Sequence, residues 1–260
     1  DRGVYLTGAC ENVTISRNTV TFSGKPGIQV VGGFGMDVES NIVTDNLDHG
    51  IALTGGASAC VVEDNESARN AHPTQVSANG IYLYGSPGNI LRRNRLHHNQ
   101  DTGLHIQSGS NNCFSYLNRS WSNGDHGYDH QSATGTIHVC DVAYGNLRDG
   151  FSLKGGSTGT RIHNSIATDN GLTTNQFDLM VDPSSNSGFV SSHNVLWNSN
   201  GQAPVKYAGS PYTSVAAYAV ASGQGASSLQ SDPRFVDPAS GDFHLQAGSP
   251  AIDNGNSGVP

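Results

Sequence analysis

The stretch Gly103-Leu104-His105-Ile106, followed 24 residues later by Gly127-Tyr128-Asp129-His130, decides the fold of this chain. The pattern, a glycine and then a short strand with alternating inward and outward residues, recurs at a spacing of 23 to 30 residues. Its glycines are Gly3, Gly27, Gly50, Gly80, Gly103, Gly127 and Gly150. A unit this short buries its apolar side only by stacking on its neighbours. We therefore expect an all-β, single-stranded right-handed parallel β-helix (a solenoid) of about eight to nine coils.

A second series of residues supports the same period. Its members, spaced by 23 to 30 residues, are Asn18, Asn41, Asn65, Asn94, Asn118, Asp141, Asn164 and Asn194. Asparagine side chains can satisfy turn backbone groups and hydrogen-bond from one coil to the next. We predict an asparagine ladder along one corner of the solenoid, and we expect Phe177-Asp178-Leu179-Met180 to continue the strand series without its glycine.

Composition and charge narrow the class of protein. The 260-residue chain has a net charge of -8 and only 13% charged residues. An acidic chain is unsuited to general nucleic-acid binding, and the sequence has no apolar run long enough for membrane insertion. Because the chain opens at Asp1 within a repeat, we interpret it as a mature or trimmed chain. We expect the protein to be secreted or at the cell surface and to be a monomer. The thiols of Cys60 and Cys113 should be free and buried. Residues 1–200 are expected to form the β-helix and residues 201–260 an irregular segment that caps its end.

Alternation along the strands places candidate functional residues on one outer face. The residues two after each glycine, including Tyr82, His105 and Asp129, should form one external column, which we extend to Asp178. The residues four after each glycine should form a second column, with Tyr84, Gln131 and Lys154 among them. Insertions at 71–77 and 172–176 leave from the same corner and should wall a groove over these coils.

The acidic residues suggest a chemistry. Asp101 and Asp125 precede their glycines by two residues, so their carboxylates should meet, with Asp129 nearby. Oxygen ligands of this kind suit Ca²⁺. A bound cation would favour a neutral Lys154, which could then remove the C5 proton of a uronic acid as a general base, with Asp129 and His105 in the catalytic cluster. We expect Tyr82, Tyr84, His126, Gln131 and Asp178 to contact the substrate.

These residues also carry a family resemblance. Asp101 and the run Asp125-His126-Gly127-Tyr128-Asp129 resemble the calcium-site pattern of polysaccharide lyase family 9, in which an Asp one coil earlier joins an Asp-Asp-Gly-Phe-Asp run. His126 stands in place of the middle acidic residue, and Lys154 lies two residues farther along its strand than the family's lysine. The resemblance covers residues 101–154 and implies a secreted, calcium-dependent lyase that cleaves pectin-like acidic polysaccharides by β-elimination.

Other functions fit the same sequence. A uronate C5-epimerase shares the first proton abstraction, although the β-helix alginate epimerases carry a His where this chain has Gln131. A glycoside hydrolase would need two suitably separated acids, for which Asp129 and Asp178 are candidates. A non-catalytic glycan-binding or structural surface module is the alternative from another class, because fold alone does not establish chemistry.

Overall fold

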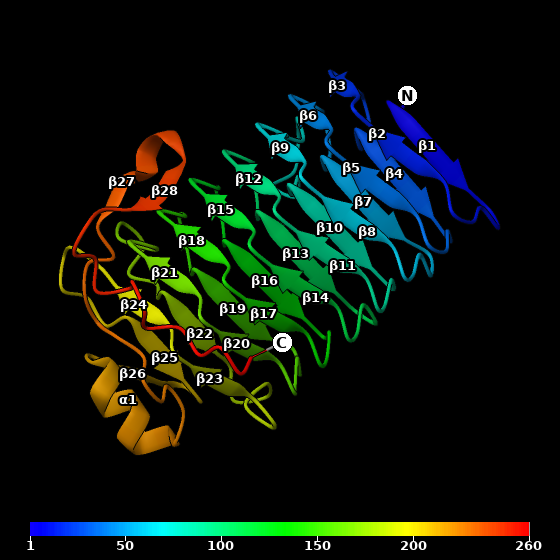
Figure 1. Ribbon diagram of the computed structural model, residues 1–260. Helices are drawn as coiled ribbons and strands as arrows, with labels where there is room; N and C mark the ends of the chain where they lie inside the picture. The colour runs from blue at the N-terminus through cyan, green and yellow to red at the C-terminus, as the bar shows by residue number, and fades with distance from the viewer. Residues whose placement is uncertain (260) are drawn as a thin grey trace.

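The computed structural model describes residues 1–259 and shows a right-handed parallel β-helix with three long sheets (Figure 1). Each coil contributes one strand to each sheet, and the strands of neighbouring coils pair in parallel. The predicted fold is therefore confirmed. Within residues 1–259, no helix is long and apolar enough to cross a membrane.

The first sheet carries the candidate site and has ten strands, of which only the last pair is antiparallel. In spatial order they are β1 (Val4–Thr7), β4 (Ile28–Val31), β7 (Ile51–Thr54), β10 (Ile81–Tyr84), β13 (Leu104–Gln107), β16 (Tyr128–Gln131), β19 (Phe151–Lys154), β22 (Leu179–Val181), β25 (Val205–Tyr207) and β26 (Ser210–Tyr212).

The second and third sheets have eight strands each and form the other two sides of the triangular solenoid. The second consists of β2 (Thr14–Ser16), β5 (Asp37–Glu39), β8 (Val61–Glu63), β11 (Ile90–Arg92), β14 (Phe114–Tyr116), β17 (Ile137–Val139), β20 (Arg161–His163) and β23 (Val190–Ser192). The third consists of β3 (Thr19–Thr21), β6 (Ile42–Thr44), β9 (Glu66–Ala68), β12 (Arg95–His97), β15 (Arg119–Trp121), β18 (Val142–Tyr144), β21 (Ile166–Thr168) and β24 (Val195–Trp197).

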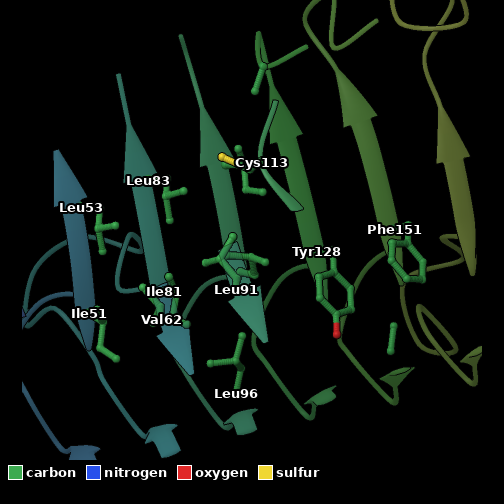
Figure 2. Packing of buried hydrophobic residues seen from close by; sticks show 14 of the residues in the cluster. Ile51, Leu53, Val62, Ile81, Leu83, Leu91, Leu96, Cys113, Tyr128 and Phe151 are labelled. Carbon is green, nitrogen blue, oxygen red and sulfur yellow. The ribbon is translucent and has the colours of Figure 1, made fainter. Parts of the chain in front are cut away.

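The core is built from inward columns in which like residues stack from coil to coil. Figure 2 shows Ile51 beside Ile81 and, farther along, Tyr128 beside Phe151, all from strands of the first sheet. The rings of Tyr128 and Phe151 are parallel, with centroids 4.7 Å apart. The glycine before each strand lets the first sheet approach the third sheet closely. A Cβ at Gly103 would lie 2.0 Å from Ser120 Oγ of the third sheet. Replacing that glycine would therefore push the first and third sheets apart.

The four cysteines form no disulfide. Cys60 and Cys113 are buried in the hydrophobic core, as predicted, whereas Cys140 is exposed at a corner.

A histidine network interrupts the apolar core at β16. His130 points inward, and its Nε2 lies 2.8 Å from Nε2 of His138, whose Nδ1 lies 2.8 Å from Asp141. Asp141 also accepts hydrogen bonds from Ser115 and from the backbone N–H of Asn118. All these side chains are buried. His130 is therefore a buried core histidine held by hydrogen bonds.

The asparagine ladder exists, with one correction. Asn41 Oδ1 accepts from both the backbone and the side-chain nitrogen of Asn18, and the pattern repeats through Asn118 to Asp141. The next member is Ser165 and not Asn164, because Ser165 Oγ accepts the Asp141 N–H while Asn164 takes the positive φ that turns the chain.

A second ladder, which the sequence analysis missed, runs along the corner between the third and first sheets. Its members are Asn46, Asn70, Asn99, Asn123, Asn146 and Asn170, and each hydrogen-bonds to the next. Asp178 closes this ladder by accepting from the backbone and side chain of Asn170.

The register after the second insertion differs from the prediction. Phe151 pairs with Leu179 and Ser152 with Met180, so the strand lies two residues later than expected. Asp178 therefore precedes the strand instead of projecting from it. Its side chain is buried and bound by Asn170 and Asn198.

The C-terminal part both covers the end of the solenoid and returns along its side (Figure 1). Helix α1 (Val215–Ser222) buries Val215 and Tyr218 against the last coils. The chain then forms β27 (Phe235–Asp237), the 3₁₀ turn η1 (Pro238–Ser240) and β28 (Asp242–Leu245). Phe243 packs on Trp121 of β15 with ring centroids 5.5 Å apart, so residues 235–245 lie against the third sheet, well away from the end.

Candidate active site

Three neighbouring strands bring His105, Asp129 and Lys154 together on the outer face of the first sheet. His105 on β13 pairs directly with Asp129 on β16, and Lys154 on β19 lies diagonally across from Asp129. Lys154 Nζ is 3.1 Å from Asp129 Oδ2, and His105 Nε2 is 3.4 Å from the same oxygen. The predicted cluster is present.

Asp129 is unusual because it is an outward-facing carboxylate with 3% exposure. Its neighbours on the same sheet cover it, and its Oδ1 is buried without a hydrogen-bond partner among residues 1–259. A buried carboxylate oxygen without a partner is costly and requires an explanation. At a sheet face next to solvent, either a water molecule or a ligand group can satisfy such an oxygen.

His105 is neutral in this setting. Burial lowers its pKa, and the nearby charge of Asp129 only partly opposes that effect. Its Nε2 lies 3.4 Å from Asp129 Oδ2, a contact without hydrogen-bond geometry, so this nitrogen is buried with no hydrogen-bond partner among residues 1–259. The imidazole can therefore keep its proton on Nε2, toward the carboxylate, and offer Nδ1 as an acceptor.

Aromatic side chains extend the face toward the N-terminal coils. Tyr82 stacks on His49 with centroids 4.3 Å apart and meets His105 edge-on at 5.6 Å. Its hydroxyl donates to Gln107 Oε1 at 2.6 Å, and burial raises its pKa. Tyr84 is 49% exposed. Both tyrosines lie on the same face as the cluster, as predicted.

Gln131 is an exposed member of the second column. Its Oε1 accepts from Gln107 Nε2 at 3.3 Å, and its backbone pairs with Lys154. It therefore borders the cluster on the solvent side, in a position from which it can contact a bound ligand.

The acidic corner lies just before the strands of the first sheet. Asp101, Asp125 and Arg148 occupy equivalent positions in three successive coils and are joined by backbone hydrogen bonds. Burial and repulsion from Asp125 raise the pKa of Asp101 to about 7. Arg148 Nε lies 3.0 Å from Asp125 Oδ1. Sequence analysis missed this arginine, although its place in the repeat could have revealed it.

The side chain of His126 is buried and hydrogen-bonded within the protein, whereas we expected it to be exposed to a substrate. Its ring is 3% exposed, and its Nδ1 accepts the backbone N–H of Asp149 at 3.1 Å. His49 Nδ1 accepts the N–H of Asn79 in the same way. Burial lowers the pKa of His126 and raises that of Asp149 to about 7. His126 and Asp178 are both buried and hydrogen-bonded within the protein, which does not support the predicted contact of either with a substrate.

The two insertions flank the acidic corner. In the first, the backbone of His72 exchanges hydrogen bonds with the side chain of Gln100. In the second, Thr174 Oγ1 donates to the carbonyl of Leu147 at 2.6 Å. A cavity of about 530 Å³ lies beside the second insertion but opens between Tyr144 and Leu172, around the corner from Asp129. The insertions therefore bracket the expected coils, while a walled groove over Asp129 stays a prediction.

Protein cations lie beside two of the three residues that are expected to bind calcium. Asp125 is paired with Arg148 and Asp129 with Lys154, so a cation of the protein already faces each carboxylate. Across residues 1–259, no group of three or more His, Cys, Asp or Glu side chains is placed to hold a metal ion. Calcium prefers about six to eight oxygen ligands.

Residues 1–214 match the family model described as "Periplasmic copper-binding protein (NosD)". The chain belongs to this NosD family. A comparison with curated protein sequences finds no match.

Several solved structures share the fold of this NosD-family chain. Pectate lyase Pel9A is similar with a TM-score of 0.67 and 19% identity over 93% of this chain. The A-module of the Azotobacter vinelandii mannuronan C-5 epimerase AlgE4 has a TM-score of 0.64 and 16% identity over 76% of this chain. A double mutant of the periplasmic alginate epimerase AlgG has a TM-score of 0.56 and 19% identity over 62% of this chain. The matched regions span 66%, 55% and 41% of those three proteins, respectively. At these identities the likeness establishes the fold alone.

Proposed function

We propose that this protein is a polysaccharide-active enzyme, and specifically a lyase that cleaves a uronic-acid-containing glycan by β-elimination. The observation that carries the proposal is the Asp129 carboxylate, buried on an outer sheet face between Lys154 and His105 with one oxygen unpartnered. A charged group held in this way at a surface is typical of a functional cluster. The fold shared with a pectate lyase and alginate epimerases supports the same class of substrate.

His105 is the proposed base. Asp129 Oδ2 faces Nε2 at 3.4 Å, a contact that would orient the imidazole if it tightened on substrate binding. Nδ1 of the neutral imidazole then accepts the proton from C5 of the uronate. The sequence predicts Lys154 in this role, but its Nζ lies 3.1 Å from Asp129 Oδ2, so we assign it to charge stabilisation instead.

Lys154 and Arg148 supply positive charge for the substrate. The Lys154 side chain is 34% exposed and that of Arg148 is 56% exposed, so both reach solvent while each also contacts an aspartate. Charge-assisted hydrogen bonds from such groups to a uronate carboxylate would acidify the C5 hydrogen. This arrangement suits an anionic polysaccharide and disfavours a neutral one.

The elimination then balances within the substrate. The electron pair of the broken C5–H bond forms the C4=C5 double bond, the C4–O bond breaks, and the leaving oxygen takes a proton from solvent. Tyr82 and Tyr84 provide flat faces for neighbouring sugar rings. An epimerase would share the first step and return a proton to the opposite face of C5, and the epimerase structures with the same fold make this the second candidate.

The family description also bears on location and metal. A family described as periplasmic supports a place outside the cytoplasm, either secreted or at the cell surface. The same description mentions copper, but the described residues provide no three-ligand His/Cys/Asp/Glu cluster on which a copper site could be built.

The proposal is tested by incubating the protein with polygalacturonate, alginate and other acidic polysaccharides and following the ultraviolet absorbance of the unsaturated uronate product. Proton NMR of the same samples detects epimerisation without cleavage. Product formation that is lost in His105→Gln and Asp129→Asn but kept in Arg161→Gln, an exposed arginine far from the cluster, supports the assignment. Equal activity in all four proteins would refute it.

A further inference from the structure

We infer that Arg148 and Lys154 take the place of a metal ion in the acidic corner, so that the site carries its own cations and binds no calcium. The inference concerns only how the carboxylates are neutralised and does not depend on the proposed lyase activity.

Arg148 is built into the carboxylate column. It follows Asp101 and Asp125 at the same position of the next coil, and its N–H donates to the Asp125 carbonyl at 2.9 Å. Although its side chain is 56% exposed, its Nε stays 3.0 Å from Asp125 Oδ1. A calcium ion would need to approach that oxygen to about 2.3–2.6 Å. The guanidinium therefore faces Asp125 Oδ1 as a counter-charge, although this contact lacks hydrogen-bond geometry.

Lys154 does the same for Asp129. Its Nζ lies 3.1 Å from Asp129 Oδ2, at the end of a side chain that crosses from β19 to β16. A divalent cation bound to Asp129 would have to displace this ammonium ion or remain beside it against charge repulsion. Each of the two carboxylates thus has one permanent counter-charge supplied by the chain.

The inference predicts how the site changes when the counter-charge is reversed. Arg148→Asp would place a third carboxylate in the column of Asp101 and Asp125, which converts a neutralised corner into a set of oxygen ligands. Arg161→Asp makes the same change of net charge on β20, where Arg161 forms no ion pair within the described chain. It is therefore the matched control.

The experiment measures the melting temperature of wild type, Arg148→Asp and Arg161→Asp in chelator and in calcium, together with calcium titration calorimetry at a temperature where each protein is folded. Wild type and Arg161→Asp should shift by less than about 1 °C, whereas Arg148→Asp should gain about 3–6 °C at free calcium ten times its Kd. Arg148→Gln, which removes the guanidinium without adding charge, covers the case in which Arg148→Asp does not fold and should gain a smaller shift. Calcium binding by wild type would overturn the inference, and so would the lack of any gain in both Arg148 variants. Neither result depends on finding a substrate.

Discussion

The ion pair between Lys154 and Asp129 allows a quantitative test of the site. At 3.1 Å and an effective dielectric constant of about 20, two unit charges attract by about 5 kcal/mol. Because Lys154 is 34% exposed, solvent screens the pair and we expect a coupling energy of about 1–3 kcal/mol. Lys154→Met alone should lower the free energy of unfolding by about 2–4 kcal/mol, since it leaves the buried Asp129 carboxylate without its cation.

The assay is urea denaturation of wild type, Lys154→Met, Asp129→Asn and the double variant. The double variant should lose less free energy of unfolding than the two single variants lose in sum. Once residue 129 is a neutral asparagine, Lys154 no longer pairs with a carboxylate, so its removal has little further effect. Lys25→Met, at an exposed position, controls for the loss of a surface lysine and should change stability by less than about 0.5 kcal/mol. Additive single losses, with a coupling below about 0.5 kcal/mol, would show that Asp129 is not stabilised by Lys154.

Three further predictions address the ladder, the pH dependence and the base. Asn123→Ala removes the oxygen that accepts a hydrogen bond from the Asn99 N–H, and it should lower the free energy of unfolding in chemical denaturation by about 3 kcal/mol. Thr173→Ala, at an exposed position, should change that free energy by almost nothing. Equal losses in the two variants would contradict a stabilising role for the ladder. Burial raises the pKa of Asp149 from its ordinary 3.8 to about 7, so ionisation of this group destabilises the folded protein as the pH rises from about 4 to 7. Asp149→Asn removes the ionisable group, so its melting temperature should increase relative to that of wild type over this pH range. A difference in melting temperature that does not change with pH would argue against burial as the cause. His105→Gln should reduce the rate by about 10²–10⁴-fold with little change in melting temperature, and the wild-type rate should fall only on the acid side, below the ordinary histidine pKa; a pH-independent rate would exclude His105 as the base.

The coil and its period were predictable from sequence because they depend on local patterns that repeat. The glycine before each strand has a steric cause that recurs in every coil, as at Gly103. The diagonal contact between Lys154 and Asp129 followed from strand alternation and register alone. Ser165 replaced Asn164 in the ladder because a hydroxyl can also accept the turn N–H, and residue type alone does not show which neighbour turns inward.

What the sequence did not predict depends on contacts without a repeat. The position of Asp178 was misjudged because the insertion at 172–176 hides how many residues the turn uses before β22 begins. The return of residues 235–245 onto Trp121 joins segments more than 100 residues apart and leaves no periodic signal. The pairing of Arg148 with Asp125 was overlooked because an arginine in an acidic column breaks the pattern that defines the column.

Ultraviolet detection of unsaturated uronate during incubation with acidic polysaccharides, with and without chelator, distinguishes a metal-independent lyase from a protein without this activity. The absorbance should rise with time on at least one uronate polymer, whether or not chelator is present, and the rise should be abolished by His105→Gln and by Asp129→Asn. The absence of both unsaturated and epimerised product from every uronate polymer would contradict the proposed function.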